Sequence, residues 1–151
     1  MSALPENMLI TRMRAKHLDR MAELEKLCFG VPWTRAMLKS ELKNPLARYF
    51  VMEENGVCVG YAGMQCVLDE GYITNIAADP TRRRVGIGRA LLGTLVEYAK
   101  RQELSFLTLE VRRSNLAAQA LYAGAGFATA GVRPGYYRSP DEDALLMTLT
   151  L

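Results

Sequence analysis

A glycine-rich turn between an apolar strand and an amphipathic helix constrains this sequence more than any other feature. The turn occupies residues 82–90 and sets Gly86 and Gly88 among four arginines. Glycines let backbone N–H groups approach a ligand closely, and the N-terminus of the following helix adds a positive dipole. Together with the arginine charges, this arrangement predicts a site for a pyrophosphate group.

The spacing of the two glycines excludes two other phosphate-binding motifs. A dinucleotide-binding fingerprint needs a third small residue three positions after the second glycine, where this chain has Leu91. A P-loop needs Gly-Lys followed by Ser or Thr, which the sequence lacks. The pattern that remains is Arg-x-x-Gly-x-Gly. Taken in isolation, such a turn is also compatible with a simple tight connection between a strand and a helix.

The composition is typical of one globular domain. The chain has 151 residues, of which 50% are hydrophobic, so we expect a single domain over residues 1–151. It has no apolar run long enough to cross a bilayer and no N-terminal signal pattern. Cys28, Cys58 and Cys66 form an odd set without Cys-x-x-Cys spacing, which argues against disulfides and a zinc site. This cysteine pattern is typical of a reducing compartment, so we expect a cytoplasmic protein.

The charge is mild but clustered. The net charge is +3, and basic residues gather at 82–89, 100–101 and 112–113. No aromatic interleaving or recognition-helix pattern accompanies them, so an anionic small molecule is expected rather than nucleic acid. His17, the one histidine, lies far in sequence from every motif and is expected on the surface, which leaves no Ser-His-Asp or Cys-His set. No metal and no membrane partner is expected, and a monomer is the expected state.

Hydrophobic periodicity predicts a mixed α/β domain in the order β-α-α-β-β-β-α-β-α-β-β. Asn55-Gly56 marks a tight hairpin, because both turn positions need positive φ. The helical stripe of residues 15–28 includes Glu25 among its apolar members, and Thr34 is expected to cap the next helix. Strands are expected at 8–13, 48–53, 57–68, 72–78, 105–111, 127–132 and 144–151, and helices at 15–28, 34–42, 84–101 and 115–125.

This order and the glycine motif together resemble the GNAT acetyltransferases. The resemblance implies a mixed, mostly antiparallel central sheet flanked by helices. Further stretches are similar to one branch, the RimI-type N-terminal protein acetyltransferases, which acetylate the α-amine of a small-subunit ribosomal protein. These stretches are Pro32-Trp33-Thr34, Asp69-Glu70, residues 75–80, residues 109–115, residues 120–122, Gly126-Phe127, Tyr136-Tyr137 and residues 142–144.

The resemblance also implies a role for each matching residue, with acetyl-CoA as the cosubstrate. Glu110 would be the general base and Tyr122 the general acid. The residues implied to bind acetyl-CoA are Ile76, Ala77 and Ala78 along the pantetheine arm, Arg83, Arg84, Val85, Gly86, Ile87, Gly88 and Arg89 around the pyrophosphate, and Asn115. The residues implied to bind the substrate peptide are Pro32, Trp33, Tyr136 and Tyr137. The two tyrosines are expected in a Gly/Pro-rich loop.

Each of these residues also has a purely structural interpretation. Glu110 shares its strand face with Thr108 and is then expected to point to solvent. Tyr122 is then an ordinary buried tyrosine, Asn115 only the N-cap of its helix, and Trp33 a hydrophobic staple. The stretch Arg133-Pro134-Gly135 departs from the polar residues that relatives often carry before the paired tyrosines, which puts the peptide specificity in question.

Three functions are compatible with the sequence. The first is acetylation of a protein N-terminus, because an α-amine with a pKa of about 7.7–8 costs about 1 kcal/mol to deprotonate at pH 7. The second is acetylation of a lysine or a small amine, although a lysine with a pKa of about 10.4 costs about 4.5 kcal/mol. The third is a non-catalytic module that binds acetyl-CoA.

Overall fold

A computed structural model describes residues 4–82 and 86–151, so the expectations for Arg83, Arg84 and Val85 lie outside the described residues. The strands are β1 Met8–Arg12, β2 Ala47–Glu54, β3 Val57–Val67, β4 Glu70–Ala78, β5 Phe106–Arg112, β6 Ala128–Tyr137 and β7 Glu142–Thr150. The helices are α1 Leu18–Cys28, α2 Arg35–Leu42, α3 Ile87–Arg101 and α4 Leu116–Gly124, with short 3-10 turns η1 Ala15–His17 and η2 Pro80–Arg82. This order confirms the predicted one.

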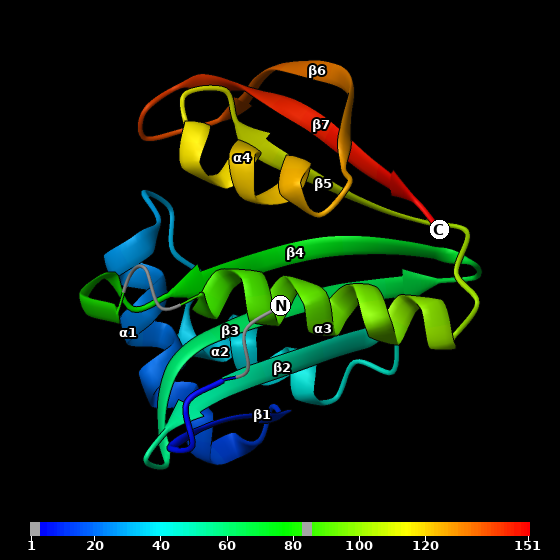
Figure 1. The fold of residues 1–151 in the computed structure, drawn as a ribbon. Helices are drawn as coiled ribbons and strands as arrows, with labels where there is room; N and C mark the ends of the chain where they lie inside the picture. Colours follow the sequence, from blue (N-terminus) through cyan, green and yellow to red (C-terminus); the bar gives the residue numbers. More distant parts are fainter. Residues whose placement is uncertain (1–3, 83–85) are drawn as a thin grey trace.

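The strands form one seven-stranded sheet in the order β1-β2-β3-β4-β5-β7-β6 (Figure 1). Strands β1 to β4 are antiparallel neighbours, and the β2–β3 hairpin turns at Asn55 and Gly56 with φ of 52° and 81°. Both positive angles were predicted from the Asn-Gly pair. Strand β5 joins β4 in parallel after the α3 crossover, and β7 and β6 continue antiparallel.

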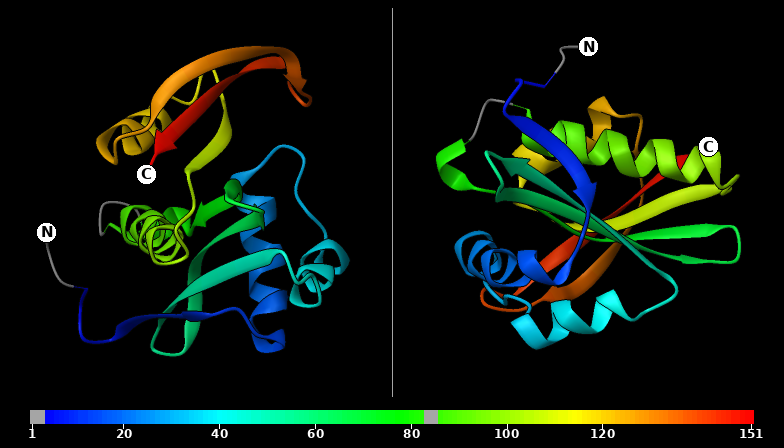
Figure 2. Two further views of the ribbon diagram at one scale, coloured as in Figure 1. Left: turned by 90° about the vertical axis from the view of Figure 1, so that its right-hand side faces the viewer. Right: turned by 90° about the horizontal axis from the view of Figure 1, so that it is seen from below.

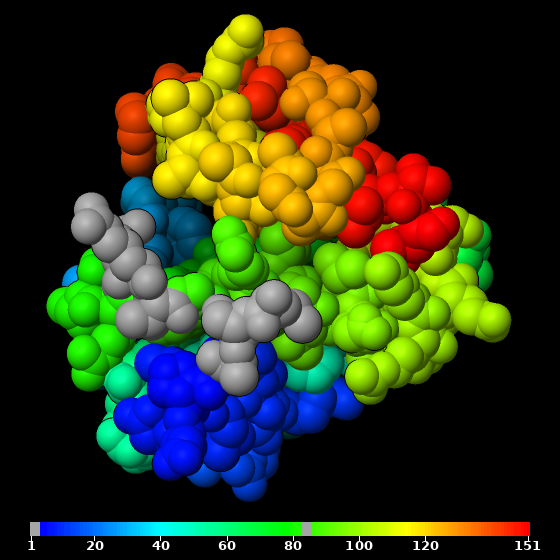
Figure 3. All heavy atoms as spheres, in the orientation of Figure 1, coloured from blue at the N-terminus to red at the C-terminus, as the bar shows by residue number. Residues whose placement is uncertain are grey.

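Helices cover both faces of the sheet. Helices α3 and α4 lie on one face, and α1 and α2 lie on the other (Figures 1 and 2). On the first face Leu91 and Leu95 of α3 are fully buried against the sheet, while Leu24 of α1 and Leu38 of α2 are fully buried on the second. A Cβ atom added at Gly88 of α3 would lie 3.4 Å from Leu121 of α4, and the two helices lie together on one surface (Figure 3). None of the helices among residues 4–82 and 86–151 is long and apolar enough to cross a membrane.

Strands β4 and β5 pair only at their beginning. Their register runs from Glu70 opposite Phe106 to Tyr72 opposite Thr108, although both strands continue beyond these pairs. In the neighbouring β3–β4 ladder Gly63 pairs with Asn75 and Met64 with Ile73, so Thr74 is the extra residue of a β-bulge. A bulge bends its strand and re-aims the residues that follow. The strands therefore diverge at the level of Ile73, and the rest of β4 presents an edge to the space between them (Figure 1).

The expected surface position of His17 is wrong. His17 is 3% exposed, and its Nε2 lies 2.6 Å from Oε2 of Glu53, another buried residue. Its Nδ1 accepts a hydrogen bond from the backbone N–H of Arg14 at 3.0 Å, so Nε2 carries the proton that is donated to Glu53. The 3-10 turn at residues 15–17 directs this polar ring inward, where Glu53 satisfies it.

The expected loop around the paired tyrosines is also wrong. Strand β6 runs through Pro134 to Tyr137 rather than ending at Val132, with a register shift between Arg133 and Tyr137. β6 is an edge strand, and a proline that lacks an N–H is tolerated there because no neighbouring strand needs the donor.

Candidate active site

The unpaired part of β4 offers backbone groups to an extended ligand. The N–H of Asp79 donates to the carbonyl oxygen of Val59 on β3 at 2.8 Å. Backbone groups alternate in direction along a strand, so those of Ile76 and Ala78 point away from β3, and those of Ala77 point toward it. The Cys28 thiol donates to the Ala78 carbonyl oxygen at 3.3 Å, in agreement with this direction. An extended arm lying between β4 and β5 would therefore pair with Ile76 and Ala78.

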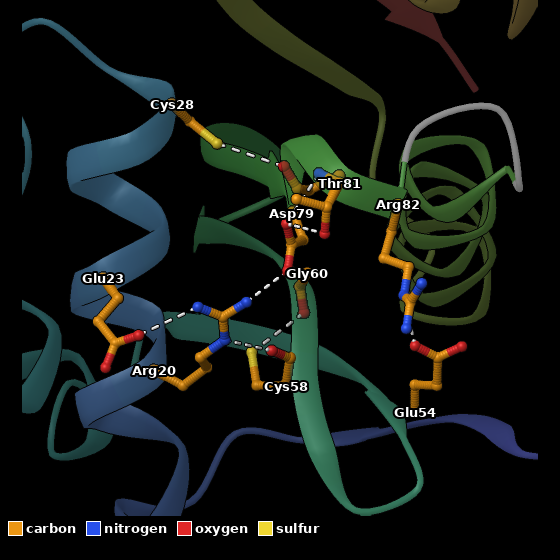
Figure 4. A network of polar contacts seen from close by, with 10 residues as sticks. Arg20, Glu23, Cys28, Glu54, Cys58, Gly60, Asp79, Thr81 and Arg82 are labelled. Carbon is orange, nitrogen blue, oxygen red and sulfur yellow. Dashed lines mark hydrogen bonds and ion pairs between the residues drawn. The ribbon is translucent and has the colours of Figure 1, made fainter.

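The connection from β4 to α3 is held by a carboxylate (Figure 4). One oxygen of Asp79 accepts hydrogen bonds from the backbone N–H and the hydroxyl of Thr81 at 2.9 and 2.8 Å, and the other is paired with Arg20 of α1. The hydrogen bond from the Thr81 backbone lowers the pKa of Asp79, with help from Arg20. Arg82 is paired with Glu54 at 2.7 Å. The turn that leads toward the predicted pyrophosphate loop is thus anchored on both sides.

The N-terminus of α3 begins at the first of the two motif glycines. Gly86 is the N-cap residue in the left-handed region, with φ of +79°, where any other residue is strained. A side chain at Gly88 would lie 3.4 Å from Leu121 of α4, so the glycine also allows the two helices to approach. Arg89 is exposed on the first turn. The first N–H groups of an α-helix have no partner within the helix, and together with the helix dipole they suit a phosphate. Phosphate binding at α3 stays a prediction.

Asn115 is the N-cap of α4. Its side-chain oxygen accepts a hydrogen bond from the backbone N–H of Ala118 at 3.1 Å, which confirms the capping interpretation. The predicted contact with the pantetheine arm is compatible with this bond, because the side-chain amide N–H₂ group remains a donor.

Glu110 points into an open groove on the face of the sheet that carries α1 and α2. The groove has a volume of about 460 Å³ and runs along β5 and β7. The carboxylate is 25% exposed and lies 3.0 Å from Nε of Arg133. It is therefore neither free in solvent nor part of the core. The residues that line the groove are Tyr72, Ser105, Phe106, Thr108, Glu110, Arg133, Leu146, Thr148 and Thr150.

Tyr122 lies on the opposite side of β5. It is 9% exposed and packs in the same core cluster as Leu109 and Val111, which alternate with Glu110 along the strand. Its ring is 5.9 Å from that of Phe127. Burial raises the pKa of the Tyr122 phenol to about 12, so it keeps its proton at any physiological pH.

The paired tyrosines Tyr136 and Tyr137 lie near Glu110, and Tyr137 also lies near Tyr122. The rings of Tyr136 and Tyr137 meet at right angles with centroids 5.0 Å apart. Burial raises the pKa of both phenols, and the nearby charge of Glu110 raises both further. Tyr122 also raises the pKa of Tyr137, so Tyr137 lies within electrostatic range of both the candidate base and the candidate acid. The guanidinium group of Arg112 stacks on the Tyr137 ring at 4.5 Å and holds it in place.

The segment between α1 and α2 closes the site from another side. A side chain at Gly30 would lie 2.3 Å from the carbonyl oxygen of Ser139, so this segment touches the β6–β7 turn. Pro32 and Trp33 are half-buried, and Trp33 packs against the core beneath α1. The predicted cap at Thr34 is confirmed, because its hydroxyl accepts from the N–H of Met37 at 3.2 Å. The segment that carries Pro32 and Trp33 thus touches the turn that follows Tyr136 and Tyr137. Contact of these four residues with a peptide remains a prediction.

Two residues of this region carried a signal in the sequence that was not assigned a role. Glu25 interrupts an apolar helical stripe, and in the structure it is 1% exposed and bonded to the backbone of Trp33. Arg133 stood out as a departure before the paired tyrosines, and it proves to be the ion partner of Glu110.

The order of strands and helices, with β4 and β5 diverging at the centre of the sheet, agrees with the acetyltransferase fold expected from the sequence. Residues 18–127 match the family described as Acetyltransferase (GNAT) family, and the chain belongs to this family of acetyltransferases.

Two similar bacterial proteins and one solved structure carry names that refer to the same reaction. The chain is 40% identical over 143 residues to the "Putative [ribosomal protein bS18]-alanine N-acetyltransferase" of Bacillus subtilis strain 168, covering 94% of this chain and 95% of that protein. It is 38% identical over 146 residues to the "[Ribosomal protein bS18]-alanine N-acetyltransferase" of Escherichia coli K12, covering 94% and 97%. The crystal structure of the ribosomal-protein-S18-alanine N-acetyltransferase from Escherichia coli superposes with a TM-score of 0.88 at 35% identity, covering 95% and 93%.

Proposed function

We propose that this acetyltransferase transfers the acetyl group of acetyl-CoA to the α-amine of a protein N-terminus, specifically the N-terminal alanine of ribosomal protein bS18. The observation that carries the proposal is the placement of Glu110 and Tyr122 on opposite sides of β5, beside the divergence of β4 and β5. The names of the relatives supply the identity of the substrate.

This placement suits a direct transfer. Acetyl-CoA would lie along the edge formed by Ile76 and Ala78, with its pyrophosphate at the N-terminus of α3. The amine would enter from the groove and attack the thioester carbonyl carbon. Glu110 accepts the proton of the amine as the N–C bond forms, and Tyr122 donates its proton to the CoA thiolate as the C–S bond breaks. The products are the acetylated N-terminus and CoA.

In the proposed reaction the two proton transfers take place on opposite sides of β5. The base faces the open groove, where a substrate amine arrives, and the acid is buried on the face that carries α3 and α4. A thiolate that leaves toward Tyr122 moves away from the amine. The thiolate therefore takes its proton from Tyr122, and Glu110 takes its proton from the amine.

A single carboxylate is adequate for an α-amine. At pH 7 an α-amine costs about 1 kcal/mol to deprotonate, against about 4.5 kcal/mol for a lysine. A protein N-terminus is therefore the easier acceptor for a site with Glu110 as its one base. Because the proposed substrate is a ribosomal protein, we propose that the reaction takes place in the cytoplasm, and we keep the monomer as the proposed state of the enzyme.

The proposal is tested by CoA release with two peptides. One is the N-terminal peptide of bS18 with a free N-terminal alanine, and the other has its α-amine blocked and carries an internal lysine. We expect turnover on the first and little on the second. Equal turnover on the blocked peptide would assign the enzyme to lysine, and turnover on neither, with acetyl-CoA still bound, would favour a small-amine substrate or a non-catalytic module.

A further inference from the structure

Glu25 is a charged side chain that the proposed chemistry does not use. It lies on α1 and is 1% exposed. Its Oε1 accepts a hydrogen bond from the backbone N–H of Trp33 at 2.7 Å. Its Oε2 accepts from the hydroxyl of Tyr61 and from Nδ2 of Asn75, the latter at 3.2 Å. Three donors thus point at one carboxylate. Only a side chain with an acceptor oxygen at both positions satisfies all three of them.

These donors come from three different parts of the fold. Trp33 belongs to the segment between α1 and α2, Tyr61 to β3 and Asn75 to β4. Burying a carboxylate is costly unless it is hydrogen-bonded, and burial here raises the pKa of Glu25. The Glu25 carboxylate therefore links the α1–α2 segment, β3 and β4 by hydrogen bonds.

The network extends to the β-bulge that precedes the divergence of β4 from β5. Oδ1 of Asn75 accepts from the hydroxyl of Tyr49 at 3.0 Å, and that hydroxyl also lies 2.8 Å from Oγ1 of Thr74, the bulged residue. Asn75 immediately precedes Ile76, where the edge offered to acetyl-CoA begins. A chain of hydrogen bonds thus connects the peptide side of the site to the cofactor side through Glu25.

We infer that Glu25 is a positioning residue that sets the segment carrying Pro32 and Trp33 at a defined place relative to β4. It acts through Trp33 and Asn75. The inference rests on the proposed function, because it takes Trp33 to lie on the side of the peptide and Asn75 on the side of acetyl-CoA. Reacting groups misplaced by about 1 Å lose about a hundredfold in rate, so the relative placement of the two sides matters for turnover.

The test compares Glu25→Gln with Glu53→Gln. Both substitutions replace a buried carboxylate by its amide, but Glu53 is bonded to His17 and Lys16, which the proposed reaction does not use. In Glu25→Gln the amide nitrogen faces the donors of Tyr61, Asn75 or Trp33, which it cannot satisfy. We expect its KM for the peptide to rise about tenfold, while its KM for acetyl-CoA changes less than about twofold. Glu53→Gln should leave both KM values unchanged.

The single tryptophan supplies a second readout. Trp33 is the one tryptophan of the chain, so fluorescence excited selectively at tryptophan reports on this segment alone. We expect Glu25→Gln to shift the emission to longer wavelength and to increase quenching by acrylamide, and Glu53→Gln to match the wild type. If Glu25→Gln does not fold, Tyr61→Phe weakens the same network by one hydroxyl and should change KM in the same direction, by about threefold.

A folded Glu25→Gln protein with unchanged fluorescence and unchanged peptide KM would overturn the inference. So would equal changes in Glu53→Gln, because general loosening of the fold would then explain both. If the wild type itself does not acetylate the bS18 peptide, the proposed function fails, and the fluorescence comparison still decides the role of Glu25.

Discussion

Arg133 and Glu110 form an ion pair across β7, with Nε of the arginine 3.0 Å from Oε1 of the carboxylate. The two side chains are 53% and 25% exposed. An ion pair this exposed contributes about 0–1 kcal/mol to stability, so its main effect is expected on the chemistry. The guanidinium places a positive charge beside Glu110, where the substrate amine arrives in the proposed reaction.

Arg133→Met should therefore lower the KM for the peptide at pH 7, where most α-amine groups are protonated. Two charges about 6 Å apart in a water-like medium repel by about 0.7 kcal/mol, which corresponds to about threefold in KM. Near pH 9 the amine is neutral and the difference should vanish. Steady-state kinetics at both pH values measure this, with the exposed Arg138→Met on the β6–β7 turn as the control. Equal KM values in the wild type and Arg133→Met at pH 7 would refute the repulsion.

Tyr122→Phe should lower kcat about a hundredfold, because the leaving thiolate loses its proton donor. The ring keeps its contact with Phe127, 5.9 Å away, so the melting temperature and the Kd for acetyl-CoA should stay close to wild type. Single-turnover kinetics and calorimetry separate the two effects. Unchanged turnover would return Tyr122 to the structural interpretation.

Glu110→Gln should reduce activity most at low pH, where neutral amine is scarce and a base is most needed. In the wild type the rate should rise with pH and then level off. Because burial raises the pKa of Tyr122 to about 12, its loss of a proton should produce no decline below about pH 10. A pH–rate profile of both proteins is the measurement. A small loss that is uniform across pH would indicate that Glu110 is structural.

Gly63→Ala should destabilise the fold by about 2–4 kcal/mol. A Cβ atom at Gly63 would lie 2.1 Å from Cε2 of Tyr49, a buried ring whose hydroxyl bonds to Thr74 and Asn75 beside the bulge. The matched control is Gly93→Ala within α3, where nothing lies within 4 Å and alanine should stabilise the helix by about 0.5–1 kcal/mol. Urea unfolding measures both, and a neutral Gly63→Ala would mean that the ring shifts without cost.

The fold was predictable because its signals are local. The Asn55-Gly56 turn, the helical stripes and the strand lengths depend on neighbouring residues, and the element order follows from them. The exceptions are long-range. The contact that buries His17 is with Glu53, which leaves no trace near position 17, and β6 continues through Pro134 because the strand lies at the sheet edge, a fact of topology.

The same distinction applies to the site. Glu110, Tyr122 and the glycine turn stand in linear motifs, so their residue types and spacing were readable from the sequence. The ion pair of Glu110 with Arg133 depends on the strand order β5-β7-β6, and the bonds of Glu25 reach to Asn75, 50 residues away. An acidic residue in an apolar stripe indicates a buried partner, but only the folded structure identifies which one.

Gly86→Glu should weaken acetyl-CoA binding at least about tenfold, because it places a bulky anion at the helix N-terminus predicted to hold the pyrophosphate. The control is Gly56→Glu in the β2–β3 hairpin. Both glycines have positive φ, +79° and +81°, and at neither does a Cβ meet an atom of the described residues within 4 Å, so both substitutions carry a similar backbone strain of about 1–2 kcal/mol. Calorimetric titration with acetyl-CoA then isolates the effect of location. If the two variants bind acetyl-CoA equally well, the α3 N-terminus does not hold the pyrophosphate.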